Sequence, residues 1–146
     1  MSITWFTALG RFLACWLKMA IDDSIRSGFV RVGAFSDLLE GGLALRFDLL
    51  ADGVHNGFYT GFVIRFDGAC YGFINRCPHA GTELDWAPGQ VFDREGQFLT
   101  CSTHGALFDP KSGLCRRGPC INQSLTPLEV KLSGDDILVK MARSAC

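Results

Sequence analysis

The chain has 146 residues, enough for one compact domain and too few for two of ordinary size. Hydrophobic residues make up 48% and charged residues 20% of the chain, which excludes a disordered or collagen-like protein. With 14 Lys and Arg against 15 Asp and Glu, the net charge is −1, so the chain has no bulk attraction to nucleic acid or to an anionic membrane.

The first predicted element is a short N-terminal helix. Residues 1–21 are apolar, but Arg11 and Lys18 interrupt them, which argues against an integral membrane span. A secretory signal would carry its charges ahead of the apolar core, so that interpretation is also disfavoured. The apolar residues recur at helical spacing, which predicts an amphipathic helix. We interpret residues 1–27 as an N-terminal extension, with a translation start at Met19 as the alternative.

From residue 28 onward the chain has the pattern of short β-strands separated by turns. Asp67-Gly68 lies between two apolar runs and predicts a hairpin, whereas only residues 36–39 resemble a helical turn. The pattern predicts an all-β fold, an antiparallel sandwich or barrel, over residues 28–143. The runs are four to eight residues long and rich in Val, Ile, Phe and Leu: 29–32, 43–49, 59–66, 70–74, 98–101, 128–132 and 137–141.

Cysteines and histidines form two matched clusters. One residue separates Cys77 from His79, two separate Cys101 from His104, and 21 residues lie between His79 and Cys101. Two thiolates and two imidazoles suit tetrahedral zinc and also an iron–sulfur cluster of mixed ligation. Structural zinc sites usually take Cys pairs and His pairs from separate knuckles, whereas here each cluster supplies one of each. This arrangement favours an iron–sulfur cluster, in which each loop reaches both irons.

The two clusters resemble the ligand boxes of Rieske [2Fe–2S] domains. Residues 77–81, CPHAG, match the C-x-H box, residues 101–105, CSTHG, match the C-x-x-H-G box, and Gly118-Pro119 resembles the family's proline loop. The resemblance runs from about residue 30 to about residue 141.

The resemblance assigns the ligands and the layout of the site. It implies that Cys77 and Cys101 bind one iron and that His79 and His104 bind the other. It also implies a Rieske-type fold in which about residues 75–119 form a small cluster-binding subdomain, with both imidazoles exposed at its tip.

The spacer between the two boxes is longer than usual in that family, and we interpret residues 86–89, WAPG, as an inserted turn. Charged residues surround the boxes and are interpreted as ordinary solvated surface or, alternatively, as a docking face for an electron-transfer partner. They are Glu83, Asp85, Asp93, Lys111, Arg116 and Arg117.

The remaining cysteines and the third histidine have other expected roles. Cys115 and Cys120 are close enough in sequence to form a disulfide, but a reducing cytosol favours two free thiols, with Cys120 near the cluster. His55 lies in a glycine-rich turn and is expected to be an exposed loop residue.

The resemblance implies a one-electron carrier, similar to the ferredoxin components of multicomponent oxygenases, with a reductase as donor and an oxygenase or other oxidoreductase as acceptor. A mononuclear iron site needs two further histidines and a carboxylate, but only His55 remains, so we expect no catalysis by the chain alone. One alternative is a partly structural Rieske-like subunit of a larger oxidoreductase, resembling that of nitrite reductase. Another is a zinc-stabilised interaction module. The expected location is the cytoplasm.

We predict a midpoint potential in the lower half of the family's range of roughly −150 to +300 mV. High-potential members carry a cysteine pair at the positions of Thr82 and Thr103, and hydroxyl groups at the positions of Ala106 and Phe108. Hydroxyl groups that donate to cluster sulfur raise the potential, and both of those donors are missing here. A redox titration with a midpoint above about +150 mV would contradict this prediction.

Overall fold

The computed structural model describes residues 28–49 and 59–141. The predicted N-terminal helix, Met19 and His55 lie outside these residues. No helix in the described part of the chain is long and apolar enough to cross a membrane. The elements in chain order are β1 (Phe29–Ala34), the 3-10 helix η1 (Phe35–Asp37), β2 (Leu45–Leu49), β3 (Tyr59–Phe66), β4 (Ala69–Ile74), β5 (Leu99–Thr100), β6 (Leu107–Phe108), β7 (Cys115–Arg117), β8 (Pro127–Leu128), β9 (Val130–Ser133) and β10 (Asp136–Lys140).

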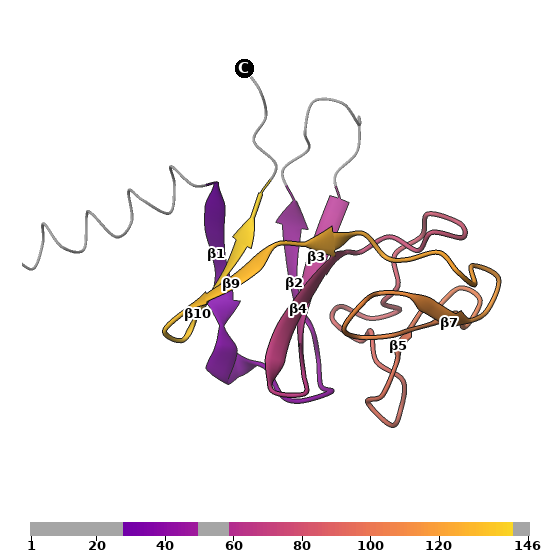
Figure 1. The fold of residues 1–146 in the computed structure, drawn as a ribbon, viewed down its shortest axis with the longest axis horizontal. Helices are drawn as coiled ribbons and strands as arrows, with labels where there is room; N and C mark the ends of the chain where they lie inside the picture. Colours follow the sequence, from indigo (N-terminus) through magenta and orange to yellow (C-terminus); the bar gives the residue numbers. More distant parts are fainter. Residues whose placement is uncertain (1–27, 50–58, 142–146) are drawn as a thin grey trace, which may run out of the picture.

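The strands form three antiparallel sheets, which confirms the predicted all-β class. Their strand orders are β1-β10-β9, β2-β3-β4-β8 and β5-β6-β7. The sheet that contains β3 lies between the other two, with β10 on one side and β5 and β7 on the other (Figure 1). The strands of the third sheet all lie between β4 and β8 in the chain. The first predicted ligand box lies between β4 and β5, and the second lies between β5 and β6.

Strand β3 is buried on both faces, which explains its uninterrupted apolar sequence. Phe62 and Ile64 pack into the core beneath the third sheet. Val63 points the other way, as alternation along a strand requires, and packs with Ile137 and Val139 of β10. The central sheet therefore packs against a separate hydrophobic core on each of its two faces.

The hairpin predicted at Asp67-Gly68 connects β3 to β4. Both residues have positive φ, 51° and 74°, as a two-residue type I′ turn requires, and Phe66 pairs with Ala69 across it.

Other predicted boundaries were less accurate. The run at 128–132 is divided between β8 and β9, and strands β6 and β7 were not predicted because they have only two and three residues.

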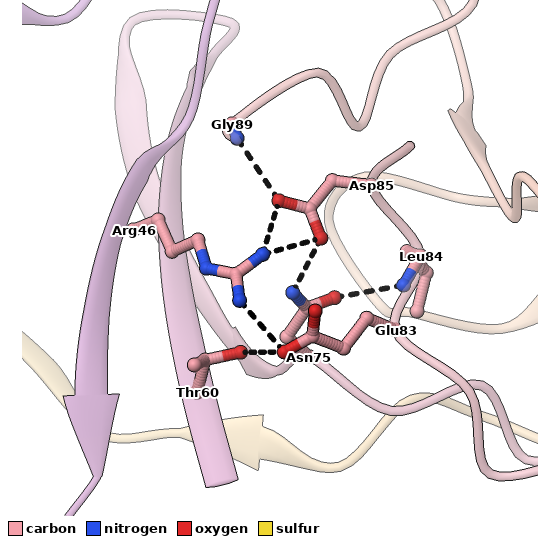
Figure 2. A network of polar contacts seen from close by, with 7 residues as sticks. All are labelled: Arg46, Thr60, Asn75, Glu83, Leu84, Asp85 and Gly89. Carbon is pink, nitrogen blue, oxygen red and sulfur yellow. Dashed lines mark hydrogen bonds and ion pairs between the residues drawn. The ribbon is translucent and has the colours of Figure 1, made fainter. Parts of the chain in front are cut away.

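A buried carboxylate ties the long spacer to the central sheet (Figure 2). Arg46 of β2 donates from Nη1 to both oxygens of Asp85, at 3.0 and 2.8 Å. Asn75, which directly follows β4, donates to the same carboxylate at 2.7 Å, and the backbone N–H of Gly89 donates at 3.0 Å. The side chain of Asp85 is 1% exposed, so its earlier interpretation as surface charge is wrong. Its short side chain points into the fold because three donors converge on it there.

The same contacts reach the second predicted ligand loop. The Asn75 side chain accepts a hydrogen bond from the backbone N–H of Leu84 at 2.8 Å. The carbonyl of Leu84 accepts one from the backbone N–H of Ser102, also at 2.8 Å. Glu83 extends the network at the surface, accepting from Arg46 and Thr60 at 2.8 Å each. Both predicted ligand loops are thus held against a single polar core.

The predicted turn at residues 86–89 is part of this framework. The N–H of Gln90 donates to the carbonyl of Ala87 at 2.9 Å, and Gly89 has a φ of 81°, as a type II turn with proline at its second position requires. The carbonyl of Gly89 accepts a hydrogen bond from the N–H of Ala44 at 2.8 Å. This turn therefore fastens the spacer to the chain just before β2, while Trp86 stays exposed.

We predict that Asp85→Asn destabilises the fold by about 2–4 kcal/mol at neutral pH, because it leaves the Arg46 guanidinium and neighbouring donors incompletely paired. Burial raises the pKa of the Asp85 carboxyl, but the donors from Asn75, Arg46 and Gly89 outweigh it and hold that pKa below its usual value. A lowered pKa contributes stability above the unfolded-state value of about 3.9, and this contribution disappears as the pH falls through the folded-state value.

Urea unfolding followed by circular dichroism measures this effect, and Asp85→Asn is also expected to flatten the acid side of the stability profile. Glu129→Gln is the matched control, because Glu129 pairs with Lys140 at 2.9 Å in an exposed site where an ion pair is worth below about 1 kcal/mol. Equal losses in the two variants would contradict the assignment of Asp85.

Candidate metal centre

The first ligand loop, residues 77–82, is closed by its own backbone. The N–H of Cys77 donates to the carbonyl of Thr82 at 2.7 Å, and the N–H of Gly81 donates back to the carbonyl of Cys77 at 2.8 Å. Gly81 has a φ of 72°, a conformation that glycine adopts without steric cost.

The second ligand loop, residues 101–106, repeats this geometry at the same spacings. The N–H of Cys101 donates to the carbonyl of Ala106 at 2.9 Å, and the N–H of Gly105 donates to the carbonyl of Cys101 at 2.9 Å. Gly105 has a φ of 65°. The two loops are structural copies that differ in the position of the histidine, which is second after the cysteine in one and third in the other.

The four predicted ligands differ in their exposure to solvent. Cys77 and Cys101 are each 1% exposed, whereas His79 and His104 are both exposed. The two imidazole rings lie 4.8 Å apart between centroids and are inclined at 77° to each other. The structure therefore brings all four residues to one place, with the thiols beneath the imidazoles.

Hydrogen-bond donors surround both buried sulfurs. The backbone N–H groups of His79 and Ala80 interact with the sulfur of Cys77. Those of Thr103 and His104 interact with the sulfur of Cys101. Burial raises the pKa of the Cys77 thiol, and its N–H donors only partly oppose this. Burial acts in the same direction on Cys101, but there the donors outweigh it and hold the pKa below its ordinary value. The site of Cys101 therefore favours the thiolate, whereas the N–H groups near Cys77 only reduce the cost of burying one.

This donor set fits a [2Fe–2S] cluster of mixed ligation. Two buried sulfurs suit one iron and two exposed imidazoles suit the other. A tetrahedral zinc site takes its ligands around one ion, and this remains the alternative that metal analysis separates from a cluster.

A hydroxyl pair bridges the two loops. The Oγ1 atoms of Thr82 and Thr103 lie 2.9 Å apart, within hydrogen-bond distance. High-potential members of the family that the sequence resembles carry a cysteine pair at these two positions. The Thr103 side chain also interacts with the sulfur of Cys101, a donor that the sequence analysis had not assigned.

Two further thiols lie beneath the first loop. Cys115 and Cys120 are free and buried, with their Sγ atoms 3.2 Å apart. Burial, followed by interactions with Cys115 and Cys77, raises the pKa of Cys120 to about 12. The expectation of free thiols, with Cys120 close to the predicted ligands, agrees with this arrangement.

The segment after β7 packs tightly against the second loop. Gly118 has a φ of 120°, and a Cβ atom there would lie 2.8 Å from Cα and 2.9 Å from Cβ of Ala106. Only glycine permits this approach, because any side chain would push the Gly118-Pro119 segment off the loop.

The charged residues around the loops are largely paired. Lys111 reaches Asp67 at 2.6 Å, and Arg116 reaches Asp109 at 3.2 Å. Arg117 is exposed at the end of β7.

We predict that Gly118→Ala destabilises the fold by about 2–4 kcal/mol and loosens the site, because it combines an unfavourable φ with a backbone clash. The measurements are the urea midpoint and the rate at which a chelator removes bound iron. Gly134→Ala is the matched control, since Gly134 has a φ of 61° and no neighbour within 4 Å. It should lose only about 1 kcal/mol and keep its iron, so equal behaviour of the two variants would contradict the packing argument.

Comparisons with known proteins agree with this geometry. The Rieske [2Fe-2S] domain family matches residues 31–140. A similar solved structure is the ferredoxin of carbazole 1,9a-dioxygenase from Nocardioides aromaticivorans IC177, which is 27% identical in sequence and has a TM-score of 0.59. The match covers 80% of this chain and 100% of that ferredoxin. Sphingomonas yanoikuyae B1 ferredoxin, at 16% identity, has a TM-score of 0.56 over 77% of this chain and 98% of that one.

A third similar structure is a complex of reduced oxygenase and oxidized ferredoxin in carbazole 1,9a-dioxygenase. It is 22% identical, with a TM-score of 0.59 over 78% of this chain and 94% of that one. No curated protein sequence matches the chain. Since the family match spans the two cysteine–histidine loops and all three sheets, the chain belongs to the Rieske [2Fe-2S] domain family.

Proposed function

We propose that the protein is a one-electron carrier that holds its [2Fe–2S] cluster on Cys77, His79, Cys101 and His104. The observation that carries the proposal is the pair of matched loops, which bring two buried sulfurs and two exposed imidazoles together. When bound, the cluster supplies reversible one-electron chemistry.

The buried cysteines and the exposed histidines have different roles in the proposed site. Cys77 and Cys101 lie out of water, where backbone N–H groups outweigh the effect of burial at Cys101 and partly offset it at Cys77. His79 and His104 face solvent, so a redox partner can approach them without any rearrangement of the fold. Burial keeps water from the sulfurs, and exposure shortens the distance that an electron must cross.

We assign the partners to a reductase as donor and an oxygenase as acceptor. Support comes from the 27% identical ferredoxin of carbazole 1,9a-dioxygenase and from the oxygenase–ferredoxin complex of similar fold. A partly structural role in a larger oxidoreductase is less consistent with the site, because all four proposed ligand residues are present and positioned together.

We also propose the organisation and the location of the protein. Residues 75–119 act as the cluster-binding subdomain of a domain spanning 28–143, since both ligand loops and the third sheet fall within them. A cytoplasmic location is supported by the free thiols of the described cysteines.

Anaerobic purification, followed by analysis of iron, acid-labile sulfide and zinc, tests the proposal. We expect two irons and two sulfides for each chain, and a Rieske-type EPR signal after reduction with dithionite. Cys77→Ser and His104→Ala should each abolish this signal, because each removes a ligand.

Cys70→Ser and His55→Ala are the matched controls and should keep the cluster, because neither residue belongs to the proposed ligand set. Zinc without sulfide in the unsubstituted protein would overturn the proposal.

A further inference from the structure

A hollow of about 640 Å³ lies beside the first ligand loop. Its walls include Tyr59, Arg76, His79, Ser124 and Thr126, and none of the residues that line it is acidic. Arg76 and His79 are both exposed. An imidazole of the proposed ligand set and a guanidinium therefore border the same open space.

The guanidinium of Arg76 is held in place by two contacts. Its Nη1 atom donates to the hydroxyl group of Tyr59 at 3.1 Å, and its Cζ atom lies 5.4 Å from the centroid of the same ring. It also lies against the first ligand loop, since a Cβ atom added to Gly81 would be 3.2 Å from Nε and 3.3 Å from Nη2. A guanidinium carries five N–H donors in a planar fork, so the bond to Tyr59 leaves others for a second acceptor.

Arg76 differs from other cationic residues near the site in its lack of an acidic partner. Arg46, Lys111 and Arg116 each form an ion pair with a carboxylate of this chain. Across residues 28–49 and 59–141, no carboxylate lies at ion-pair distance from Arg76. Its positive charge is therefore not neutralised within the described part of the chain.

A second hollow, of about 990 Å³, lies beside the other ligand loop and includes Gly105 of that loop. It contains two arginines and two carboxylates, which are Arg94, Arg117, Asp93 and Glu95. Because these charges balance, this second hollow does not select a partner of one sign. The uncompensated positive charge lies on the side of the first ligand loop.

We propose that the hollow beside His79 is a docking site for a carboxylate side chain of the redox partner, which Arg76 binds through its guanidinium. This inference rests on the proposed function and names the chemistry by which the partner is recognised. The fork of an arginine matches the two oxygens of a carboxylate, and Arg76 is already ordered by Tyr59 and Gly81. A carboxylate bound there would bring the surface of the partner over the exposed His79.

The expected effect is mainly on the rate of encounter. An ion pair at an exposed site contributes little affinity, whereas complementary charge accelerates association and fixes the orientation of the partners. Salt weakens this attraction, so the rate should depend on ionic strength. The salt dependence separates recognition by charge from a purely structural role of Arg76.

Stopped-flow kinetics with two cobalt(III) complexes of opposite charge test the proposal. The cobalt(III) complex of ethylenediaminetetraacetate is an anion built from carboxylates, and tris(phenanthroline)cobalt(III) is a cation. The cluster-loaded protein is reduced with dithionite, freed of the excess and mixed with one complex. One electron then passes from the reduced cluster to cobalt(III), so that the cluster is oxidised and cobalt(II) is formed.

Arg76→Gln should slow the reaction with the anionic complex about threefold to tenfold at an ionic strength of about 10 mM, where the Debye length is about 30 Å. The difference should disappear near about 1 M, and the reaction with the cationic complex should not be slowed. Arg31→Gln is the matched control, because it removes the same charge from β1, which the central sheet separates from the third sheet (Figure 1). It should leave both rates nearly unchanged.

A footprinting measurement on the unsubstituted protein tests the site without any electron transfer. Phenylglyoxal modifies exposed guanidinium groups, and mass spectrometry measures the extent at each arginine. A hexaglutamate peptide, which presents carboxylate side chains, should protect Arg76 from modification and leave Arg31 unprotected. Equal protection at the two arginines, or none at Arg76, would overturn the inference.

Three kinetic results would also overturn it: an unchanged rate of Arg76→Gln with the anionic complex, equal slowing with both complexes, or equal slowing in Arg31→Gln. Iron and sulfide analysis comes first and separates the two levels of the argument. Failure of the unsubstituted protein to hold a cluster would refute the proposed function, whereas a normal cluster without this selectivity for negative charge would refute only the docking role of Arg76.

Discussion

The buried carboxylate of Asp85 is the interaction on which the geometry of the site depends. It receives donors from Arg46 of β2 and from Asn75, two residues before the first ligand cysteine. Through Asn75 and Leu84 the same network extends to Ser102 in the second ligand loop. A single charge out of water thus fixes both loops relative to the central sheet. Its burial is tolerated because the carboxylate is fully engaged by an ion pair and hydrogen bonds, whereas loss of one partner would leave charge without compensation.

Around this framework the chain separates two requirements of an electron carrier. The sulfurs need a dry site with donors, because negative charge collects on them, and the core beneath the third sheet provides it. In the proposed site the imidazoles need exposure, because electrons would enter and leave beside them, and both histidines are exposed at the loop tips. The two loops meet both requirements with the same backbone hydrogen bonds, so their likeness in three dimensions is closer than their sequences indicate.

The sequence predicted what local pattern and spacing determine. The run at 59–66, the Asp67-Gly68 hairpin and the all-β class follow from alternation, turn chemistry and short apolar runs. The residues that meet at the site could be proposed because their spacing resembles a known family, and the fold brings them together. Asp85 could not be placed, because nothing local to it distinguishes a carboxylate that is buried by a partner 39 residues away from one on the surface.

The hydroxyl bridge between Thr82 and Thr103 has a consequence for where such a protein can work. A disulfide between these loops would be subject to thiol exchange, and its survival would depend on the reducing power of the surroundings. A hydrogen bond between two threonines contains no bond that glutathione or thioredoxin can cleave. It reforms within the lifetime of a local fluctuation and needs no oxidising catalyst during maturation. The contact that joins these two loops is therefore independent of the thiol chemistry of the surroundings.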